Sequence, residues 1–349
     1  MPLYCKIKKY LSSFTLDVEI DTSDERMALL GASGSGKSMT LRCVAGIEKP
    51  DEGQILLNNV TLFDSEKGIN LPPQKRNVGF LFQDYALFPN MTALENILTG
   101  TRKLHKAERD SAARRITQAF HLEGLEARYP SQLSGGERQR CALARTMVGQ
   151  PEILMIDEPF SALDSYLRWQ LEQELDTILD KFGKPILYVS HNRDEVYRLC
   201  DRITVMNRGT SESSREKWDL FRNPVTYHAA LLTGCKNITS VTASNNHISA
   251  PEWGLEFDTE ETTEAVKFMG IRANYIIPAH KAGKNDEGVI FDYEIVREIE
   301  DTFSCILMVR RRNTDCTPIR WELRKDERHA MREYPQRLCI PRKHILLLK

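Results

Sequence analysis

The chain has 349 residues, of which 41% are hydrophobic and 28% are charged, and its formal net charge is −1. A chain of this length is too long for one ordinary hydrophobic core, so we expect two globular domains. The near-neutral charge argues against a protein that works mainly by non-specific binding to DNA or RNA. No apolar run approaches the ~20 residues that span a bilayer, and no segment of signal-peptide length opens the chain. We therefore expect any work at a membrane to depend on a partner.

Eight cysteines are scattered along the chain, and none forms a C-x-x-C pair. Disulfide frameworks belong to short secreted chains, and zinc sites need clustered ligands. We therefore expect free, mostly buried thiols and a reducing, cytoplasmic compartment.

Alternating apolar positions within residues 1–30 predict two paired strands with a turn at Ser12-Ser13. Next comes Met27–Leu30, a run that is apolar at every position and leads into a glycine-rich loop. A strand buried on both faces inside a parallel sheet has this pattern. The pattern recurs at Ile153–Ile156, Ile186–Val189 and Ile203–Met206. Helical periodicity between such runs, as in Tyr166–Phe182, completes an alternation that predicts an α/β fold with right-handed crossovers.

The glycine-rich loop fits G-x-x-x-x-G-K-[ST] and follows a predicted strand, as a phosphate-binding loop requires. It consists of Gly31, Ala32, Ser33, Gly34, Ser35, Gly36, Lys37 and Ser38. The glycines allow backbone N–H groups to surround a phosphate, and the N-terminus of a helix follows. We expect Lys37 to bind the β- and γ-phosphates of a nucleotide and the Ser38 hydroxyl to ligate Mg²⁺.

Residues 84–150 interrupt the strand–helix alternation with a mostly helical insertion, in which helical patterns cover Ala107–His121 and the stretch from Gly136 to Val148. The sequence LSGGERQR occupies Leu133–Arg140. Its residues Ser134, Gly135 and Gly136 offer a hydroxyl and free N–H groups at the start of a helix. From the residues alone, this arrangement is either a second anion site or an ordinary N-cap.

Asp157 and Glu158 follow the buried run Ile153–Ile156, where side chains emerge beside the phosphate-binding loop. We expect Asp157 to hold Mg²⁺, directly or through water, and Glu158 to polarise an attacking water molecule. His191 follows the run Ile186–Val189 and therefore falls on the same edge of the predicted sheet.

The character of the sequence changes after about Thr233. Residues 251–264 hold six acidic residues and no basic ones, whereas residues 301–349 hold twelve Lys and Arg against six Asp and Glu. Short alternating runs in this part predict a small β-barrel or sandwich. We place the boundary within residues 225–238 and expect domains at 1–232 and 233–349.

Taken together, the phosphate-binding loop, LSGGERQR and the segment Ile153–Pro159 resemble the nucleotide-binding subunit of ATP-binding-cassette (ABC) transporters, strongly over residues 1–230. The resemblance implies an ABC-type P-loop NTPase core of α/β class with a helical subdomain at about 84–150. It also implies a head-to-tail homodimer in which Ser134, Gly135 and Gly136 of one chain cap the ATP held by the other.

The resemblance assigns further residues. Gln83 occupies the position of the family's Q-loop glutamine, which reaches Mg²⁺ or the attacking water, and His191 resembles the switch histidine that contacts the γ-phosphate. Asp164 ends a segment, 161–164, that resembles the D-loop crossing the dimer interface. An aromatic residue of the family stacks on adenine; Tyr10 is favoured here, with Leu11 and Phe14 left as alternatives.

The segment from Thr61 to Gly79 looks like the corresponding stretch of molybdate importer ATPases, with sulfate importers close behind, and residues 233–349 resemble the family's OB-like TOBE domain. The implied function is ATP hydrolysis that drives uptake of an oxyanion, molybdate or sulfate. The implied partners are two membrane permease subunits and an extracytoplasmic binding protein, at the cytoplasmic face of the membrane, with no nucleic acid.

Iron, polyamine or sugar import remains an alternative. A soluble ABC-type ATPase acting on nucleic acid or ribosomes is disfavoured, because the chain has one cassette and no long coiled-coil insertion.

Overall fold

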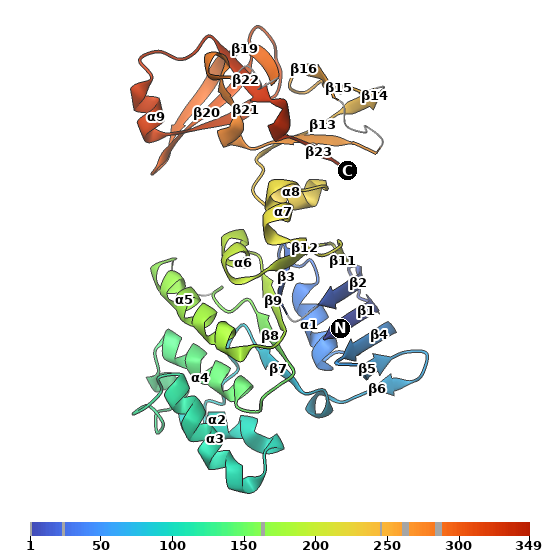
Figure 1. Cartoon of the computed structure of the whole chain (residues 1–349), viewed down its shortest axis with the longest axis vertical. Helices are drawn as coiled ribbons and strands as arrows, with labels where there is room; N and C mark the ends of the chain where they lie inside the picture. Colours follow the sequence, from blue (N-terminus) through green and yellow to red (C-terminus); the bar gives the residue numbers. More distant parts are fainter. Residues whose placement is uncertain (1, 23–24, 162–164, 245, 260–264, 283–287) are drawn as a thin grey trace. The chain divides into compact units, whose positions relative to one another are not determined.

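The computed structural model describes residues 2–22, 25–161, 165–244, 246–259, 265–282 and 288–349. The chain divides into two compact units, Met1–Lys217 and Trp218–Lys349 (Figure 1). Helix α8 (Tyr227–Leu232) belongs to the second unit, where the Tyr227 N–H donates a hydrogen bond to the Lys349 carbonyl. A division of functional domains between residues 232 and 233 stays a prediction.

The first unit contains a 12-stranded sheet in the order β6-β5-β4-β1-β2-β11-β10-β3-β9-β8-β7, with β12 paired to β10. Its antiparallel part consists of β1 (Leu3–Tyr10), β2 (Thr15–Thr22), β4 (Glu52–Leu57), β5 (Val60–Asp64), β6 (Ile69–Asn70), β11 (Thr210–Ser211) and β12 (Arg215–Glu216). Its parallel part consists of β3 (Arg26–Gly31), β7 (Val78–Leu81), β8 (Ile153–Asp157), β9 (Ile186–Ser190) and β10 (Arg202–Asn207). The predicted α/β core with a buried parallel sheet is therefore confirmed.

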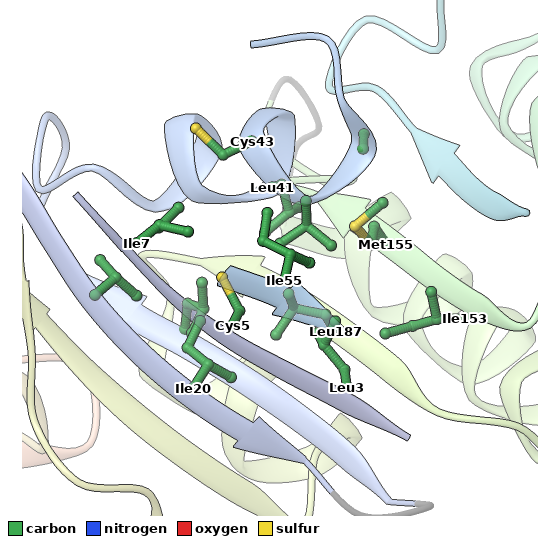
Figure 2. Packing of buried hydrophobic residues seen from close by; sticks show 14 of the residues in the cluster. Leu3, Cys5, Ile7, Ile20, Leu41, Cys43, Ile55, Ile153, Met155 and Leu187 are labelled. Atoms are coloured by element: carbon green, nitrogen blue, oxygen red, sulfur yellow. The ribbon is translucent and has the colours of Figure 1, made fainter. Parts of the chain in front are cut away.

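Strands β8 and β9 are buried at every position, as their continuous apolar sequences predict. Helix α1 (Lys37–Ala45) lies against the sheet, and its Leu41 packs in one core with side chains of both sheet parts, such as Ile55 and Leu187 (Figure 2). Because parallel strands end at one edge of a sheet, the loops after β3, β8 and β9 meet there. The remaining helices around this sheet are α5 (Ser165–Phe182), α6 (Arg193–Leu199) and the 3-10 turn η1 (Pro73–Lys75).

A helical insertion separates β7 from β8, as expected. It contains α2 (Ala93–Gly100), η2 (Thr101–Lys103), α3 (Lys106–Ala119), η3 (Pro130–Gln132) and α4 (Gly135–Met147). Capping boxes start two of the three α-helices: Thr92 with Glu95 begins α2, and Ser134 with Glu137 begins α4. None of the helices in the described residues combines the length and the apolar character that crossing a bilayer requires.

The second unit is rich in β-structure, as its short alternating runs predict. Its sheets are β13 (Asn237–Ser240), β17 (Phe268–Ile271) and β23 (Ile345–Leu348); β14 (Thr242–Ser244), β15 (His247–Ala250) and β16 (Leu255–Asp258); and β18 (Ile277–Pro278), β22 (Arg337–Pro341), β19 (Gly288–Glu300), β20 (Ser304–Arg311) and β21 (Ile319–Arg324). Besides α8, its short helical elements are α9 (Lys325–Ala330), η4 (Ala273–Tyr275), η5 (Ala279–Lys281) and η6 (Arg342–His344), and α7 (Lys217–Arg222) spans the division between the units. The core is built around the fully buried Trp321.

A buried carboxyl group lies beneath the end of β9. Glu195 on α6 is 3% exposed and accepts a hydrogen bond from the Tyr188 hydroxyl. Burial raises the pKa of Glu195 from 4.5 to about 7; the hydrogen bonds from Tyr188 and Ser190 oppose the rise, and the charge of Glu172 adds to it. Because Ser190 directly precedes His191, this carboxyl group supports the loop that carries a predicted site residue.

We predict that Glu195→Gln removes a pH-dependent part of the stability. In the unfolded chain the carboxyl group has its ordinary pKa of 4.5, whereas in the fold it holds its proton up to about pH 7. The folded state therefore binds the extra proton, and the free energy of unfolding falls as the pH rises through this window. The fall amounts to a few kcal/mol, at about 1.4 kcal/mol per pKa unit.

Urea unfolding of the parent and the variant, at several pH values between 4.5 and 8, measures this effect. The parent should lose stability relative to Glu195→Gln as the pH rises. A difference between the two proteins that stays constant over the whole range would contradict the prediction.

Candidate nucleotide-binding site

The loop between β3 and α1 has the backbone that a phosphate cradle needs. Gly34 and Gly36 have φ values of 78° and 102°, in the left-handed region that favours glycine. A Cβ atom on Gly36 would also lie 2.6 Å from Cδ1 of Leu16. Any other residue at this position would be strained and would displace a core side chain, so the loop depends on glycine there.

Lys37 places a positive charge inside this loop. The residue is 4% exposed, and its Nζ donates hydrogen bonds of 2.9 Å to the carbonyl oxygens of Gly31 and Ala32. The same Nζ lies 3.6 Å from Oε1 of Glu158. Burial lowers the pKa of Lys37, and the carboxylates of Glu158 and Asp157 oppose that shift. A buried ammonium group of this kind is stabilised by a nearby anion, such as a phosphate.

Ser38 and Asp157 join the start of α1 to the end of β8. The Ser38 hydroxyl donates a hydrogen bond of 2.8 Å to Oδ1 of Asp157. Burial raises the pKa of Asp157, while this hydrogen bond opposes the rise. The sequence separates the two residues by 119 positions, and the fold brings Asp157 beside the phosphate-binding loop, as its place at the end of a buried strand predicts.

Glu158 lies between Lys37 and His191. Its Oε2 is 2.9 Å from Nδ1 of His191, and its backbone N–H donates to the Val189 carbonyl. Its φ of 42° is left-handed, an unfavourable conformation for a side chain of this kind. Three loops, after β3, β8 and β9, thus bring together Lys37, Glu158 and His191. The catalytic roles of these residues stay predictions.

Gln83 follows β7, and its hydrogen-bond partner is Ser161 rather than Lys37, Glu158 or His191. Its Nε2 donates a hydrogen bond of 3.0 Å to the Ser161 hydroxyl, on the chain that follows Glu158. The fold therefore joins Gln83 to the segment predicted to be a D-loop. Of that segment, Ala162, Leu163 and the predicted site residue Asp164 lie outside the described residues.

Ser134 caps α4. Its hydroxyl accepts a hydrogen bond from the Glu137 N–H, and the Glu137 carboxylate accepts one from the Ser134 N–H. Among the described residues, no hydrogen bond links Ser134, Gly135 or Gly136 to the phosphate-binding loop of the same chain. Within one chain this segment is a helix cap, and its predicted contact with ATP involves a second chain.

The three candidates for adenine stacking have different surroundings. The Tyr10 hydroxyl donates a hydrogen bond of 2.7 Å to Glu52 on β4. Leu11 lies in the turn, where its N–H donates to the Phe14 carbonyl. Phe14 packs beside the loop glycine, since a Cβ on Gly36 would lie 3.5 Å from its ring. The ring of Phe14 thus lies beside Gly36 of the phosphate-binding loop, and the choice among the three candidates stays a prediction.

A groove of about 560 Å³ lies where the insertion meets the sheet. Sequence reasoning did not identify Arg145, which lines this groove, because an arginine inside a helix carries no motif. The lining residues are Gln74, Asn77, Val78, Gly79, Phe80, Phe82, Ala86, Phe88, Thr99, Gly100, Arg102, Arg145, Thr146, Gly149 and Pro151.

Curated relatives of this chain are import ATP-binding proteins. The "Sulfate/thiosulfate import ATP-binding protein CysA 1" of Rhizobium meliloti is 41% identical, over 67% of this chain and 67% of the relative. The "Molybdenum import ATP-binding protein ModC" of Paramagnetospirillum magneticum is 38% identical, over 62% and 60%. The "Spermidine/putrescine import ATP-binding protein PotA" of Acetivibrio thermocellus is 40% identical, over 65% and 63%. The chain thus spans between 60% and 67% of the length of these relatives.

A solved structure and a family model point to the same family as these relatives. The solved "Dimeric Structure of MJ0796, a Bacterial ABC Transporter Cassette" superposes with a TM-score of 0.52 at 29% identity, over 62% of this chain and 98% of that one. The family model described as "ABC transporter" matches residues 15–161. The sulfate/thiosulfate relative is 41% identical over two thirds of its own length. Together with the family model and the solved cassette, this match shows that the chain belongs to the ABC transporter family, as an importer-type ABC ATPase.

Proposed function

We propose that this chain hydrolyses ATP to drive uptake of a tetrahedral oxyanion, with molybdate as the first candidate and sulfate as the second. The observation that supports it most is the meeting of Lys37, Glu158 and His191 beside the phosphate-binding loop, with Glu158 3.6 Å from Lys37 and 2.9 Å from His191. Phosphoryl transfer to water needs a cation on the phosphates and a base for the water, and these side chains supply both.

Each of these residues has a role in the proposal. Lys37 binds the β- and γ-phosphates, and Glu158 accepts a proton from the attacking water. His191 contacts the γ-phosphate, and its hydrogen bond with Glu158 orients both side chains. Gln83 reaches toward the water or the ion from the Ser161 side of the site. The three pieces of chain that carry Lys37, Glu158 and His191 are held by one rigid sheet, which keeps their geometry fixed.

Mg²⁺ fits the oxygen atoms of Ser38 and Asp157, which lie 2.8 Å apart beside the loop. Among the described residues, no group of three or more His, Cys, Asp or Glu is arranged to hold a metal. The ion would therefore take its other ligands from the nucleotide phosphates and from water, and it would neutralise charge on the phosphates.

We propose a head-to-tail homodimer in which Ser134, Gly135, Gly136 and Asp164 of each chain complete the ATP site of the other. The proposal is supported by the N-terminus of α4, a 13-residue helix that presents N–H groups and a positive dipole to an anion. The solved bacterial cassette that this chain resembles is itself described as dimeric, in line with the proposal.

The groove beside the insertion is the proposed docking site for a short helix of each membrane permease subunit. Its apolar residues include Phe80, Phe82 and Phe88, and the last of these is 45% exposed. An extracytoplasmic binding protein would deliver cargo to the permease, and the chain would work at the cytoplasmic face of the membrane. The second unit would act as a TOBE-like regulatory domain.

The relatives are named for the import of three different cargoes: sulfate/thiosulfate, molybdenum and spermidine/putrescine. The segment between Thr61 and Gly79, which resembles molybdate and sulfate importer ATPases, favours an oxyanion. Polyamine import remains the alternative outside the oxyanion class, supported by the spermidine/putrescine relative.

Changing Glu158 to Gln tests the catalytic assignment. The amide cannot accept the proton, so we expect kcat to fall by about 10²–10⁴-fold, while ATP binding persists because Lys37 and Ser38 are intact. Phosphate release and fluorescent-nucleotide binding measure the two effects. Glu19→Gln, which removes a surface ion pair with Lys6, is the matched control and should keep the parental rate. A Glu158→Gln rate within tenfold of the parent would contradict the assignment.

Deleting the gene tests the cargo. We expect the deletion strain to accumulate less molybdenum at low molybdate, and to recover when molybdate is added in excess. Elemental analysis of the cells, together with uptake of labelled sulfate, gives the readout. Normal molybdenum with failing sulfate uptake would move the assignment to sulfate, and normal uptake of both would overturn the oxyanion proposal.

A further inference from the structure

Two consecutive residues after β7 adopt an unfavourable backbone conformation. Tyr85 and Ala86 have φ values of 62° and 43°, both in the left-handed region. Residues with a Cβ atom avoid this region because the atom approaches the backbone too closely. A pair of such residues persists only where the surrounding structure holds it.

Arg145 on α4 holds this turn. Its guanidinium donates one hydrogen bond of 2.7 Å to the Tyr85 carbonyl and one of 2.6 Å to the Ala86 carbonyl. The planar fork of arginine suits two acceptors side by side, which a lysine cannot satisfy in the same way. The guanidinium also lies 5.8 Å from the centre of the Phe88 ring. Burial lowers the pKa of Arg145, so its partners stabilise a charge that is partly removed from water.

The hydroxyl group of Tyr85 reaches the chain that follows Glu158. Its hydroxyl donates a hydrogen bond of 3.1 Å to the carbonyl of Pro159, the residue after Glu158. Burial raises the pKa of Tyr85, which keeps the hydroxyl protonated as a donor. Glu158 is itself left-handed, and its carbonyl accepts a hydrogen bond from the Ser161 N–H. The Pro159 carbonyl belongs to the peptide that joins Pro159 to Phe160, so the Tyr85 hydrogen bond holds the chain immediately after Glu158.

We propose that Tyr85 is a positioning residue that sets the direction of Glu158 through Pro159, and that Arg145 is the residue that holds Tyr85 in place. This chain of contacts joins α4, whose first residues are proposed to cap the partner's ATP, to the proposed base. Ala86 and Arg145 also line the groove described above, so a permease helix bound in the groove would contact these two residues. The inference rests on the proposed role of Glu158.

The test uses the full-length chain and the variant Tyr85→Phe, which removes one hydroxyl and keeps the ring. We expect kcat for ATP hydrolysis to fall roughly 10- to 100-fold, as a small displacement of a catalytic group can cost. KM for ATP should stay within about twofold, because the phosphate-binding residues are untouched. Tyr4→Phe on β1 is the matched control and should change neither constant.

Two double variants separate positioning from general stability. Combining Tyr85→Phe with Arg145→Lys should lower kcat no further than the larger single effect, since both act on one link. Adding Tyr85→Phe to Glu158→Gln should leave the residual rate unchanged, because the group being positioned is already disabled. If Arg145→Lys fails to fold, the rates of Tyr85→Phe and of its combination with Glu158→Gln still test whether Tyr85 positions Glu158.

Two results would overturn the inference: a Tyr85→Phe kcat within twofold of the parent, or an equal fall in kcat when Glu158 is already Gln. A failure of the proposed function looks different. In that case Glu158→Gln itself would keep the parental rate, whatever Tyr85→Phe does.

Discussion

A single buried ammonium group, that of Lys37, determines how the rest of the site is arranged. It is 4% exposed and is surrounded by the carbonyls of Gly31 and Ala32 and the carboxylate of Glu158. A charge removed from water in this way is costly unless opposite charge lies close to it. Glu158 supplies part of that charge, and a phosphate in the loop would supply more. The same pairing brings the proposed base next to the proposed binding position of the γ-phosphate.

Glu158, Tyr85 and Ala86 have unfavourable backbone conformations, and each is held by an identified contact. Glu158 is fixed by the hydrogen bond from its N–H to Val189, and Tyr85 and Ala86 are fixed by Arg145. Strain of this kind is common where a side chain must point in one direction for chemistry. The sheet supplies the rigid part of the site, because its buried strands β8 and β9 cannot shift without disturbing the core.

Much of the first unit follows from local sequence. Runs that are apolar at every position predict the buried strands, and the positions of Gly34, Gly36 and Lys37 predict the phosphate-binding loop. Strand order then brings Asp157, Glu158 and His191 to one edge, because parallel strands end together. The β-rich second unit follows from alternating runs such as the one that becomes β20.

Other features depend on contacts between residues far apart in the chain, which no local pattern encodes. Arg145 and Tyr85 are 60 positions apart, and Gln83 and Ser161 are 78 apart, so neither hydrogen bond is visible in a motif. The packing of α8 with the chain end is equally non-local. The hydrogen bond from Tyr10 on β1 to Glu52 on β4 also cannot be predicted from the spacing of residues in the sequence.

The most direct test of the central claim is a crystal structure of the full-length chain with Mg²⁺ and a non-hydrolysable ATP analogue. The account predicts that Lys37 and His191 contact the γ-phosphate, that Ser38 and Asp157 lie at the ion, and that Ser134 of a second copy caps the same phosphate. An analogue bound away from Gly31–Ser38, or a γ-phosphate that contacts neither Lys37 nor His191, would contradict it.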